Sequence, residues 1–325
     1  MEERDVLKGV GYIFPGQASQ KVGMGEDLLN AFPAYSAKFH ELNAASSKDL
    51  LGLCLKGPEE ALNDTVNTQP CIYAVSVSIY HVLKEMGLGI PQAVAGHSLG
   101  EYSALNGAGV FGYVQGLRYV QYRADFMKDA AEKNPGVMYA ISKPNFDVLW
   151  NIFSIISGKG VIKIANYNSP KQVVVAMQAT LEEKALQLLR EAGRIIKLPV
   201  NGAFHTSLMT EANSKLYNAH FNQSAFGYPH CQVYSNYDGS PSKDPLLIGS
   251  KLINQMPSSV RWVDTINNMY NDGVRTYVEV GPGNVLANLM KHFDLPDVTV
   301  LSTRNVEGLN QVIEHLQTIK KVVMY

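Results

Sequence analysis

A serine, a histidine and an arginine in this 325-residue sequence have surroundings that suit them to acyl-transfer chemistry. The serine, Ser98, is the centre of residues 96–100, which read G-H-S-L-G. A G-x-S-x-G sequence is typical of a nucleophile elbow, a sharp turn between a strand and a helix that exposes the serine hydroxyl. Residues 93–95 form an apolar run that predicts a buried strand before Ser98, and the sequence after Ser98 predicts a helix. The strand–turn–helix order of an elbow is therefore present. On the pentapeptide alone, an ordinary N-cap serine is the alternative.

The elbow would also supply a place for negative charge. Gly96 and Gly100 would let neighbouring backbone approach without a Cβ clash. Free N–H groups at the start of the following helix stabilise an oxyanion. The backbone N–H of Leu99, directly after the serine, is the expected donor.

A serine hydroxyl is a weak nucleophile until a base accepts its proton, and His205 is the candidate base. It follows residues 199–203, which lead back from the middle region of the chain. We therefore expect it at a junction of two domains, where clefts form. A satisfied surface-loop histidine is the alternative.

The arginine, Arg123, lies in a predicted helix at residues 114–131 and points along an apolar stripe. A buried arginine is costly unless it is paired, and no acid of this helix has the spacing to pair with it. A planar guanidinium suits a carboxylate. An arginine that extends from the helix edge to water is the alternative. The stripe consists of Leu117, Val120, Ala124 and Met127.

Strands that alternate with helices predict a parallel α/β sheet as the frame for these residues. The strands are expected at residues 10–14, 93–96, 233–235 and 276–280. Helices are expected at residues 71–84, 98–107, 114–131 and 284–292.

The middle of the chain has a different pattern. Strands at 137–142, 161–167, 172–178 and 194–198 and helices at 146–157 and 181–192 are predicted. Their order is β-α-β-β-α-β, the ferredoxin-like signature. The predicted fold class is thus α/β, with a large α/β-hydrolase-like domain formed by residues 1–131 and 200–325. A ferredoxin-like subdomain at 132–199 is inserted in it.

The overall composition argues against several classes of function. A formal charge of −1 argues against a nucleic-acid binder. The three scattered cysteines have neither metal-ligand nor disulfide-framework spacing, so we expect no metal and a reducing, cytoplasmic location. No apolar stretch has membrane-spanning length, and no secretory signal is visible. We expect a monomer.

Four segments, in order along the chain, resemble the malonyl-CoA:acyl-carrier-protein transacylases and the acyltransferases of polyketide synthases. The resemblance covers about residues 10–305 and extends to the inserted subdomain. The sequence departs from the family at Ala18, where glycine is usual, and at residues 257–260. The four segments are 14–20 (F-P-G-Q-A-S-Q), 96–105 (G-H-S-L-G-E-Y-S-A-L), 203–209 (A-F-H-T-S-L-M) and 278–283 (V-E-V-G-P-G).

The resemblance implies roles for several residues that could not be inferred from their spacing in the sequence. The backbone N–H of Gln17 is the second oxyanion donor, and the backbone carbonyl of Gln255 orients His205 in place of a carboxylate. Arg123 binds the free carboxylate of malonyl-type acyl groups. Phe204, together with Leu99, favours malonyl over 2-methyl-branched groups.

The resemblance also implies that Asn166 and Asn168 line the cleft, although a turn-forming role is equally compatible with the sequence. The implied activity is transfer of malonyl from coenzyme A to the phosphopantetheine thiol of an acyl-carrier protein. The implied pathway is polyketide or fatty-acid biosynthesis, with a free-standing polyketide acyltransferase favoured. No cofactor beyond the substrate is implied. A hydrolase that clears acyl groups from carriers and a non-catalytic carrier-docking module are the alternatives.

Overall fold

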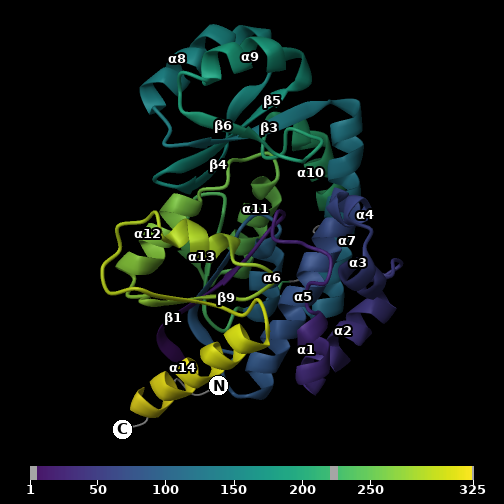
Figure 1. Ribbon diagram of the computed structural model, residues 1–325, viewed down its shortest axis with the longest axis vertical. Helices are drawn as coiled ribbons and strands as arrows, with labels where there is room; N and C mark the ends of the chain where they lie inside the picture. Colours follow the sequence, from purple (N-terminus) through teal and green to yellow (C-terminus); the bar gives the residue numbers. More distant parts are fainter. Residues whose placement is uncertain (1–5, 220–225, 324–325) are drawn as a thin grey trace.

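The computed structural model describes residues 6–219 and 226–323 and shows two sheets stacked along the long axis (Figure 1). The larger sheet has the order β10-β9-β1-β2-β7-β8, and all its neighbouring strands are parallel except β7 and β8. Parallel pairing brings the carboxyl ends of β1, β2 and β7 to one edge. The strands are β1 Leu7–Phe14, β2 Pro91–Gly96, β7 Gln232–Tyr234, β8 Pro241–Ser242, β9 Thr276–Glu279 and β10 Thr299–Ser302.

Helices cover the large sheet, and α5 is the most buried of the long ones, packing against α2, α3, α6 and α7. The helices before the small subdomain are α1 Glu26–Ala31, α2 Pro33–Ala45, α3 Leu50–Lys56, α4 Glu59–Asn63, α5 Thr65–Glu85, α6 Gly100–Gly107 and α7 Tyr113–Lys133. Those after it are α10 Thr210–Ala219, α11 Pro245–Gln255, α12 Trp262–Asn271, α13 Val285–Met290 and α14 Val306–Val323. None of the described helices is long and apolar enough to cross a membrane.

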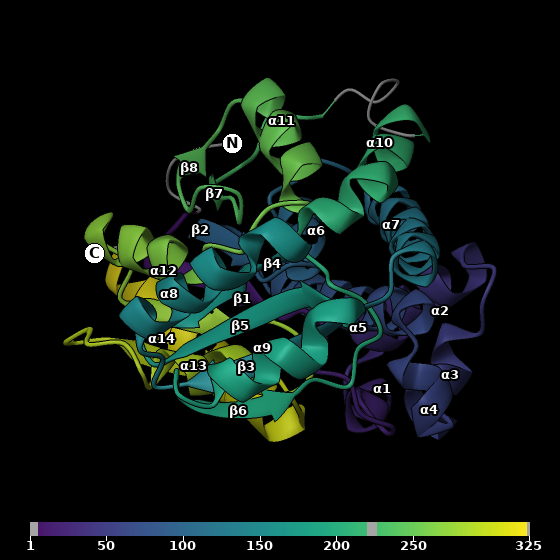
Figure 2. The same ribbon diagram turned by 90° about the horizontal axis from the view of Figure 1, so that it is seen from above.

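The smaller sheet is fully antiparallel, with the order β4-β5-β3-β6 and a hydrophobic core of its own. Its two helices cover its outer face (Figure 2). Numbered within the unit, the strand order is 2-3-1-4, which is the ferredoxin-like arrangement. The elements are β3 Gly136–Ser142, α8 Phe146–Ile156, β4 Ile162–Ser169, β5 Gln172–Gln178, α9 Glu182–Leu189 and β6 Arg194–Lys197. Short 3-10 turns lie at Ser157–Lys159, Ala179–Leu181 and Ser207–Met209.

The predicted fold class is confirmed: a mostly parallel sheet carries an inserted four-stranded antiparallel unit. The boundaries at residues 132 and 199 stay a prediction. One local expectation is wrong, because the helix after the elbow begins at Gly100 rather than at Ser98. The φ of Ser98 is 52°, and this left-handed conformation cannot continue into a right-handed helix.

The small subdomain is tied to the large one by the segment between α11 and α12. The N–H of Tyr167 donates to the carbonyl of Val260 at 2.9 Å, and the N–H of Val260 donates to the carbonyl of Ala165 at 2.8 Å. The hydroxyl of Ser259 donates to the carbonyl of Ile164 at 2.6 Å. This segment therefore extends the edge of the small sheet.

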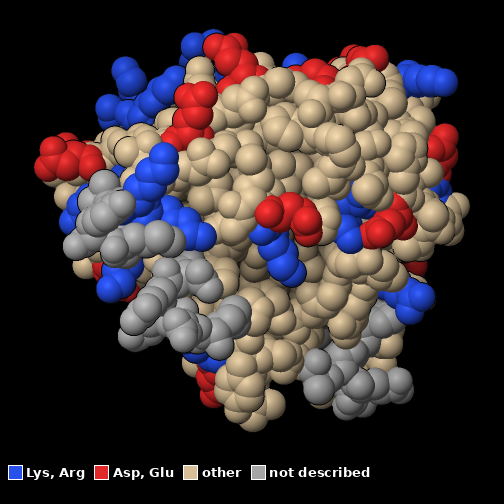
Figure 3. All heavy atoms as spheres, turned by 90° about the horizontal axis from the view of Figure 1, so that it is seen from below, with Lys and Arg blue, Asp and Glu red and all other residues tan. Residues whose placement is uncertain are grey.

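The surface opposite the small subdomain is shown in Figure 3. Basic and acidic side chains are interspersed there among uncharged ones, and neither sign dominates the view. The near-neutral formal charge agrees with that mixture. The described residues visible in this view form no broad basic surface of the kind that nucleic-acid binders show.

Candidate active site

Ser98 lies in the turn that joins β2 to α6, at the carboxyl edge of the large sheet. The amide of Asn236, which follows β7, holds both sides of this turn. Its Oδ1 accepts the N–H of Ser98 at 2.6 Å, and its Nδ2 donates to the carbonyl of Gly96 at 2.6 Å. These bonds stabilise the left-handed backbone of Ser98, a conformation that costs about 1–3 kcal/mol for residues other than glycine.

Glycine is required where three backbone segments meet beneath the serine. A Cβ at Gly96 would lie 1.9 Å from the carbonyl carbon of Gly100, and a Cβ at Gly100 would lie 2.0 Å from the carbonyl oxygen of Phe14. A Cβ at Gly16 would lie 2.4 Å from the carbonyl oxygen of His97. The loop after β1 therefore contacts the elbow directly, and this contact brings Gln17 to the serine.

The backbone N–H groups of Gln17 and Leu99 have no acceptor among the residues that the structure describes. Both residues line the same cavity as Ser98. Two free donors beside a nucleophile are what an oxyanion hole requires. Ala18 has a φ of 86°, in the region that favours glycine, so the family's usual glycine at this position has a steric reason.

His205 lies between the two sheets, and its ring contacts Ser98 directly. Its Nε2 is 2.7 Å from Oγ of Ser98. Its Nδ1 is 3.1 Å from the carbonyl oxygen of Ser258 and 3.3 Å from that of Gln255. Because carbonyls only accept, Nδ1 carries the proton, and Nε2 is left to accept the serine hydroxyl. Ser258 is an orienting group that the sequence did not indicate.

Burial keeps this imidazole neutral. His205 is 3% exposed, and burial, followed by the Arg123 guanidinium, lowers the pKa of His205 to about 3. A neutral imidazole at physiological pH can accept a proton from the serine hydroxyl.

Acylation of Ser98 should therefore keep most of its neutral-pH rate down to about pH 5, since His205 stays unprotonated there. A histidine with an ordinary pKa of about 6.5 would lose most of its base form by that pH. The measurement is the rate of acyl-enzyme formation in rapid-quench experiments with malonyl-CoA between pH 5 and 8. A rate that falls about tenfold per pH unit below about 6.5 would show that the pKa is unperturbed.

Arg123 is fully buried in α7 and reaches the serine. Its Nη2 donates to Oγ of Ser98 at 3.0 Å and to Oε1 of Gln255 at 3.1 Å, and its Nη1 donates to Oε1 of Gln69 at 2.5 Å. Its Nε has no partner among the described residues, and no described carboxylate lies within salt-bridge distance of the guanidinium. A buried cation held only by neutral groups has unused capacity for an anionic ligand.

The buried acid nearest to Arg123 is Glu101 of α6. Because it lies on another helix, the spacing of acids along α7 could not indicate it. Its Oε2 accepts Nε2 of Gln255 at 2.8 Å and the N–H of Asn236 at 3.2 Å. The Gln255 side chain thus lies between the Glu101 carboxylate and the Arg123 guanidinium. Burial raises the pKa of Glu101 to about 7. Glu101 positions this network without pairing with the guanidinium, and the ring centre of Tyr102 lies 5.6 Å from Cζ of Arg123.

The cavity at this site has a volume of about 240 Å³ and is shared by the two domains. Phe204 forms part of its wall, and Asn166 and Asn168 line it from β4. Oδ1 of Asn168 lies 2.8 Å from Nε2 of His97, so this asparagine also joins the subdomain to the elbow. The structure brings together all nine residues that the sequence singled out. Among the described residues, no group of His, Cys, Asp and Glu could hold a metal ion.

The chain is similar over nearly its whole length to known acyltransferases. Residues 11–318 match the family model described as acyl transferase domain. A malonyl CoA-acyl carrier protein transacylase of Haemophilus influenzae is 37% identical, over 95% of this chain and 100% of that protein. The chain belongs to the malonyl-CoA:acyl-carrier-protein transacylase family.

Two solved structures in this transacylase family are close to the present one. One is a malonyl-transacylase in complex with a type II polyketide synthase acyl-carrier protein, with a TM-score of 0.89, 35% identity, and coverage of 94% of this chain and 99% of that one. The other is an acyl carrier protein S-malonyltransferase from Vibrio cholerae, with a TM-score of 0.88, 36% identity and the same coverage. The family assignment made from four sequence segments is confirmed.

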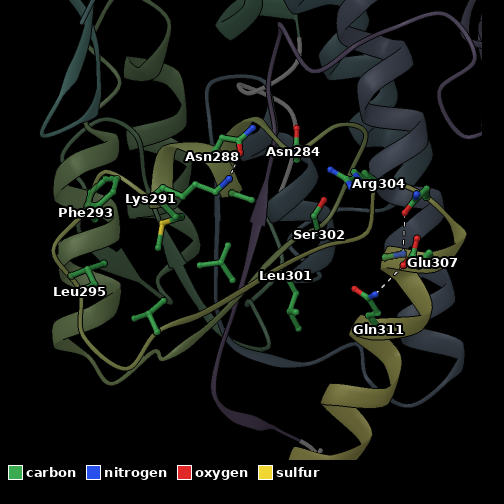
Figure 4. Close-up of a pocket in the computed structure, with 16 residues that line it drawn as sticks. Asn284, Asn288, Lys291, Phe293, Leu295, Leu301, Ser302, Arg304, Glu307 and Gln311 are labelled. Carbon is green, nitrogen blue, oxygen red and sulfur yellow. Dashed lines mark hydrogen bonds between the residues drawn. The ribbon is translucent and has the colours of Figure 1, made fainter. Parts of the chain in front are cut away.

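In this transacylase, helix α13 separates the catalytic cavity from a second one. Val285, Leu286 and Leu289 line the catalytic cavity. The opposite side of the helix lines a cavity of about 510 Å³, into which Lys291 and Arg304 extend (Figure 4). None of the nine predicted site residues lines this second cavity, which is thus separate from the predicted site.

Proposed function

We propose that this chain is a malonyl-CoA:acyl-carrier-protein S-malonyltransferase that works through an ester on Ser98. The observation that carries the proposal is the buried guanidinium of Arg123, 3.0 Å from the serine hydroxyl and without a carboxylate partner in the described chain. A malonyl thioester has a reactive carbonyl and a free carboxylate one carbon apart. A nucleophile beside a guanidinium fits both groups at once.

In the first half-reaction, the guanidinium binds the malonyl carboxylate and His205 accepts the proton of Ser98. The serine oxygen attacks the thioester carbonyl, and the N–H groups of Gln17 and Leu99 hold the oxyanion. The carbon–sulfur bond breaks, and the coenzyme A thiolate takes the proton from Nε2 of His205. The product is the malonyl ester of Ser98.

The second half-reaction runs in the reverse sense with a different thiol. The phosphopantetheine thiol of the carrier gives its proton to His205 and attacks the ester carbonyl. The bond from carbon to the serine oxygen breaks, and that oxygen regains the proton. A cavity of about 680 Å³ adjoins the catalytic one, shares Gln17, Pro199 and Phe204 with it, and offers space for the pantetheine arm.

The side chains of the cavity wall would determine whether malonyl or a substituted malonyl group is accepted. Phe204 is 6% exposed, so its ring is fixed by packing, and Leu99 is 1% exposed. We propose that these side chains leave little space for a 2-methyl branch. One methyl contributes only about 1–3 kcal/mol of discrimination in an apolar pocket, so a preference for malonyl is expected rather than exclusion of methylmalonyl. Asn166 and Asn168 would contact the bound acyl group from β4.

The setting of the reaction is fatty-acid or polyketide synthesis, with a free-standing polyketide acyltransferase included in the proposal. A cytoplasmic location also belongs to it. The cysteines Cys54, Cys71 and Cys231 are buried as free thiols, which is in keeping with a reducing compartment.

The test uses malonyl-CoA labelled in the malonyl group, with a phosphopantetheine-bearing acyl-carrier protein as acceptor. Label should move to the carrier, with less label released as free malonate than transferred. Release of free acid in excess of transfer would instead identify a hydrolase. Failure to acylate the protein at all would identify a docking module without catalysis.

A further inference from the structure

A third cavity, of about 540 Å³, shares no lining residue with the catalytic cavity. It lies where the end of α5, the end of α6, the first turn of α7 and helices α2 and α14 meet. Nothing in the proposed transfer reaction uses it.

Apart from the tyrosines Tyr80 and Tyr113, all the titratable side chains that line this cavity are basic. They are Lys38, Lys84, Lys320, His81 and His230, from four separate parts of the chain. Lys38 is only 7% exposed, and its Nζ lies 3.6 Å from the centre of the Tyr113 ring. Nζ of Lys320 donates to the carbonyl of Gly87 at 2.8 Å. Lys84 has no hydrogen-bond or ion-pair partner in the part of the chain that the structure describes.

The acids nearest to these groups do not line the cavity. Glu41 pairs with Lys38, and Oε1 of Glu85 lies 3.8 Å from Nε2 of His81. The two carboxyl side chains are 53% and 61% exposed, and the Glu41 carboxylate also bonds to Tyr113, which lines the cavity. Within the described residues, positive charge therefore exceeds negative charge inside the cavity.

The start of α7 opens onto the same cavity. Its N-cap, Gly112, makes no side-chain capping bond, and the first turn of this 21-residue helix contains no acid. Gly112 and Tyr113 line the cavity, and a Cβ added at Gly112 would meet nothing within 4 Å. Free N–H groups and the positive end of this helix dipole thus add to the field of the lysines, while the C-terminal ends of α5 and α6 oppose it.

The positive charge of the cavity contributes to lower pKa values of the two histidines that line it. The pKa of His81 is lowered by burial and then by Lys38, and the pKa of His230 is lowered by burial and then by Lys84. An anion bound in the cavity would raise the pKa of both histidines, opposite to the effect of the lysines.

We propose that this cavity binds the phosphate group of a small phosphorylated metabolite. The first turn of α7 and Lys84 would contact its oxygens, as helix N-termini and lysines do at other phosphate sites. Tyr80, Phe111 and Tyr113 line the remaining space and suit the organic part of a phosphomonoester. The inference does not depend on the transferase proposal, because no catalytic residue takes part.

The test is titration of the full chain with inorganic phosphate and, separately, with phenyl phosphate at low ionic strength. The ring signals of His81 and His230 are followed by NMR, together with the melting temperature. We expect the pKa of both histidines to rise, because a nearby anion favours the protonated ring, and the melting temperature to rise with ligand concentration. Tighter binding of phenyl phosphate, by about tenfold, would identify an organic ester as the ligand, and equal binding would identify free phosphate.

Two variants localise the binding. Gly112→Asp places a carboxylate at the N-cap, where it should cap α7, keep the melting temperature of the free protein and abolish phosphate binding. Lys84→Gln should weaken binding by about tenfold. Lys56→Gln is the matched control, since Lys56 also lies in the last turn of a helix but does not line this cavity. Absence of histidine shifts at millimolar ligand, or unchanged binding by Gly112→Asp, would overturn the proposal.

Discussion

Ser98→Ala should remove the malonyl adduct that forms on the protein and slow transfer to the carrier by about 10⁴-fold or more. The hydroxyl of Ser98 is the group on which the proposed base and the guanidinium converge, at 2.7 Å and 3.0 Å. Without it, His205 has no nucleophile to activate. The oxyanion donors and Arg123 remain, so malonyl-CoA should still bind while its acyl group is no longer transferred.

The measurement is intact mass after mixing with malonyl-CoA, followed by transfer to the carrier. Ser103→Ala is the matched control, because Ser103 lies in the adjoining helix α6, is 1% exposed, and its Oγ has no partner among the described residues. That variant should fold and carry the adduct like the unchanged protein. An adduct of the same mass on Ser98→Ala would place the nucleophile elsewhere.

The frame of the site was predictable because the large sheet follows strong local patterns. The strands at β1, β2 and β9 are short apolar runs that end at glycine or proline, and their alternation with helices favoured parallel pairing. β10 and α14 were not predicted. Thr299 of β10 is exposed and the other three residues are partly buried. Its sequence, T-V-L-S, has neither the continuous apolar run of a buried strand nor an unambiguous alternation.

The residues proposed for catalysis differ in how much the sequence around each of them indicates its role. Ser98 lies in a motif whose two glycines are required by close backbone contacts, so the motif itself indicates its role. The roles of His205 and Arg123 were inferred from the family resemblance. The side chains that hydrogen-bond to these residues were not indicated by the sequence around them. Asn236 bonds to the elbow across 138 residues, and Gln69 bonds to the guanidinium across 54. Such contacts depend on which strands and helices become neighbours.

Strand order would have supplied part of what was missed. Asn236 follows β7 by two residues, and β7 pairs with β2, which leads into the elbow. Knowledge of that pairing would place Asn236 beside Ser98, because carboxyl ends of parallel strands share an edge. Glu101 was within the recognised elbow segment, but its partner Gln255 is 154 residues away.

Arg123→Ala should lower kcat/KM for malonyl-CoA by about 10²–10³-fold and shift preference toward neutral acyl groups such as acetyl. The present guanidinium has neutral partners only, and a malonyl carboxylate would complete its pairing. An acetyl group leaves that buried charge unpaired, which is how the arginine rejects it. Once the charge is removed, the penalty against acetyl disappears, and so does the attraction for malonyl.

The measurement is kcat/KM for malonyl-CoA and acetyl-CoA with each variant, supported by intact mass of the acyl-enzyme. Arg118→Ala is the matched control: it makes the same change in charge on the same helix, and Arg118 is exposed and outside the cavity. Arg123→Lys keeps the charge but not the two-pronged geometry, so it should retain malonyl preference at a reduced rate. If Arg123→Ala still preferred malonyl over acetyl as strongly as Arg118→Ala does, the carboxylate would be bound by another group, and the guanidinium would serve only to hold Ser98, Gln69 and Gln255 in place.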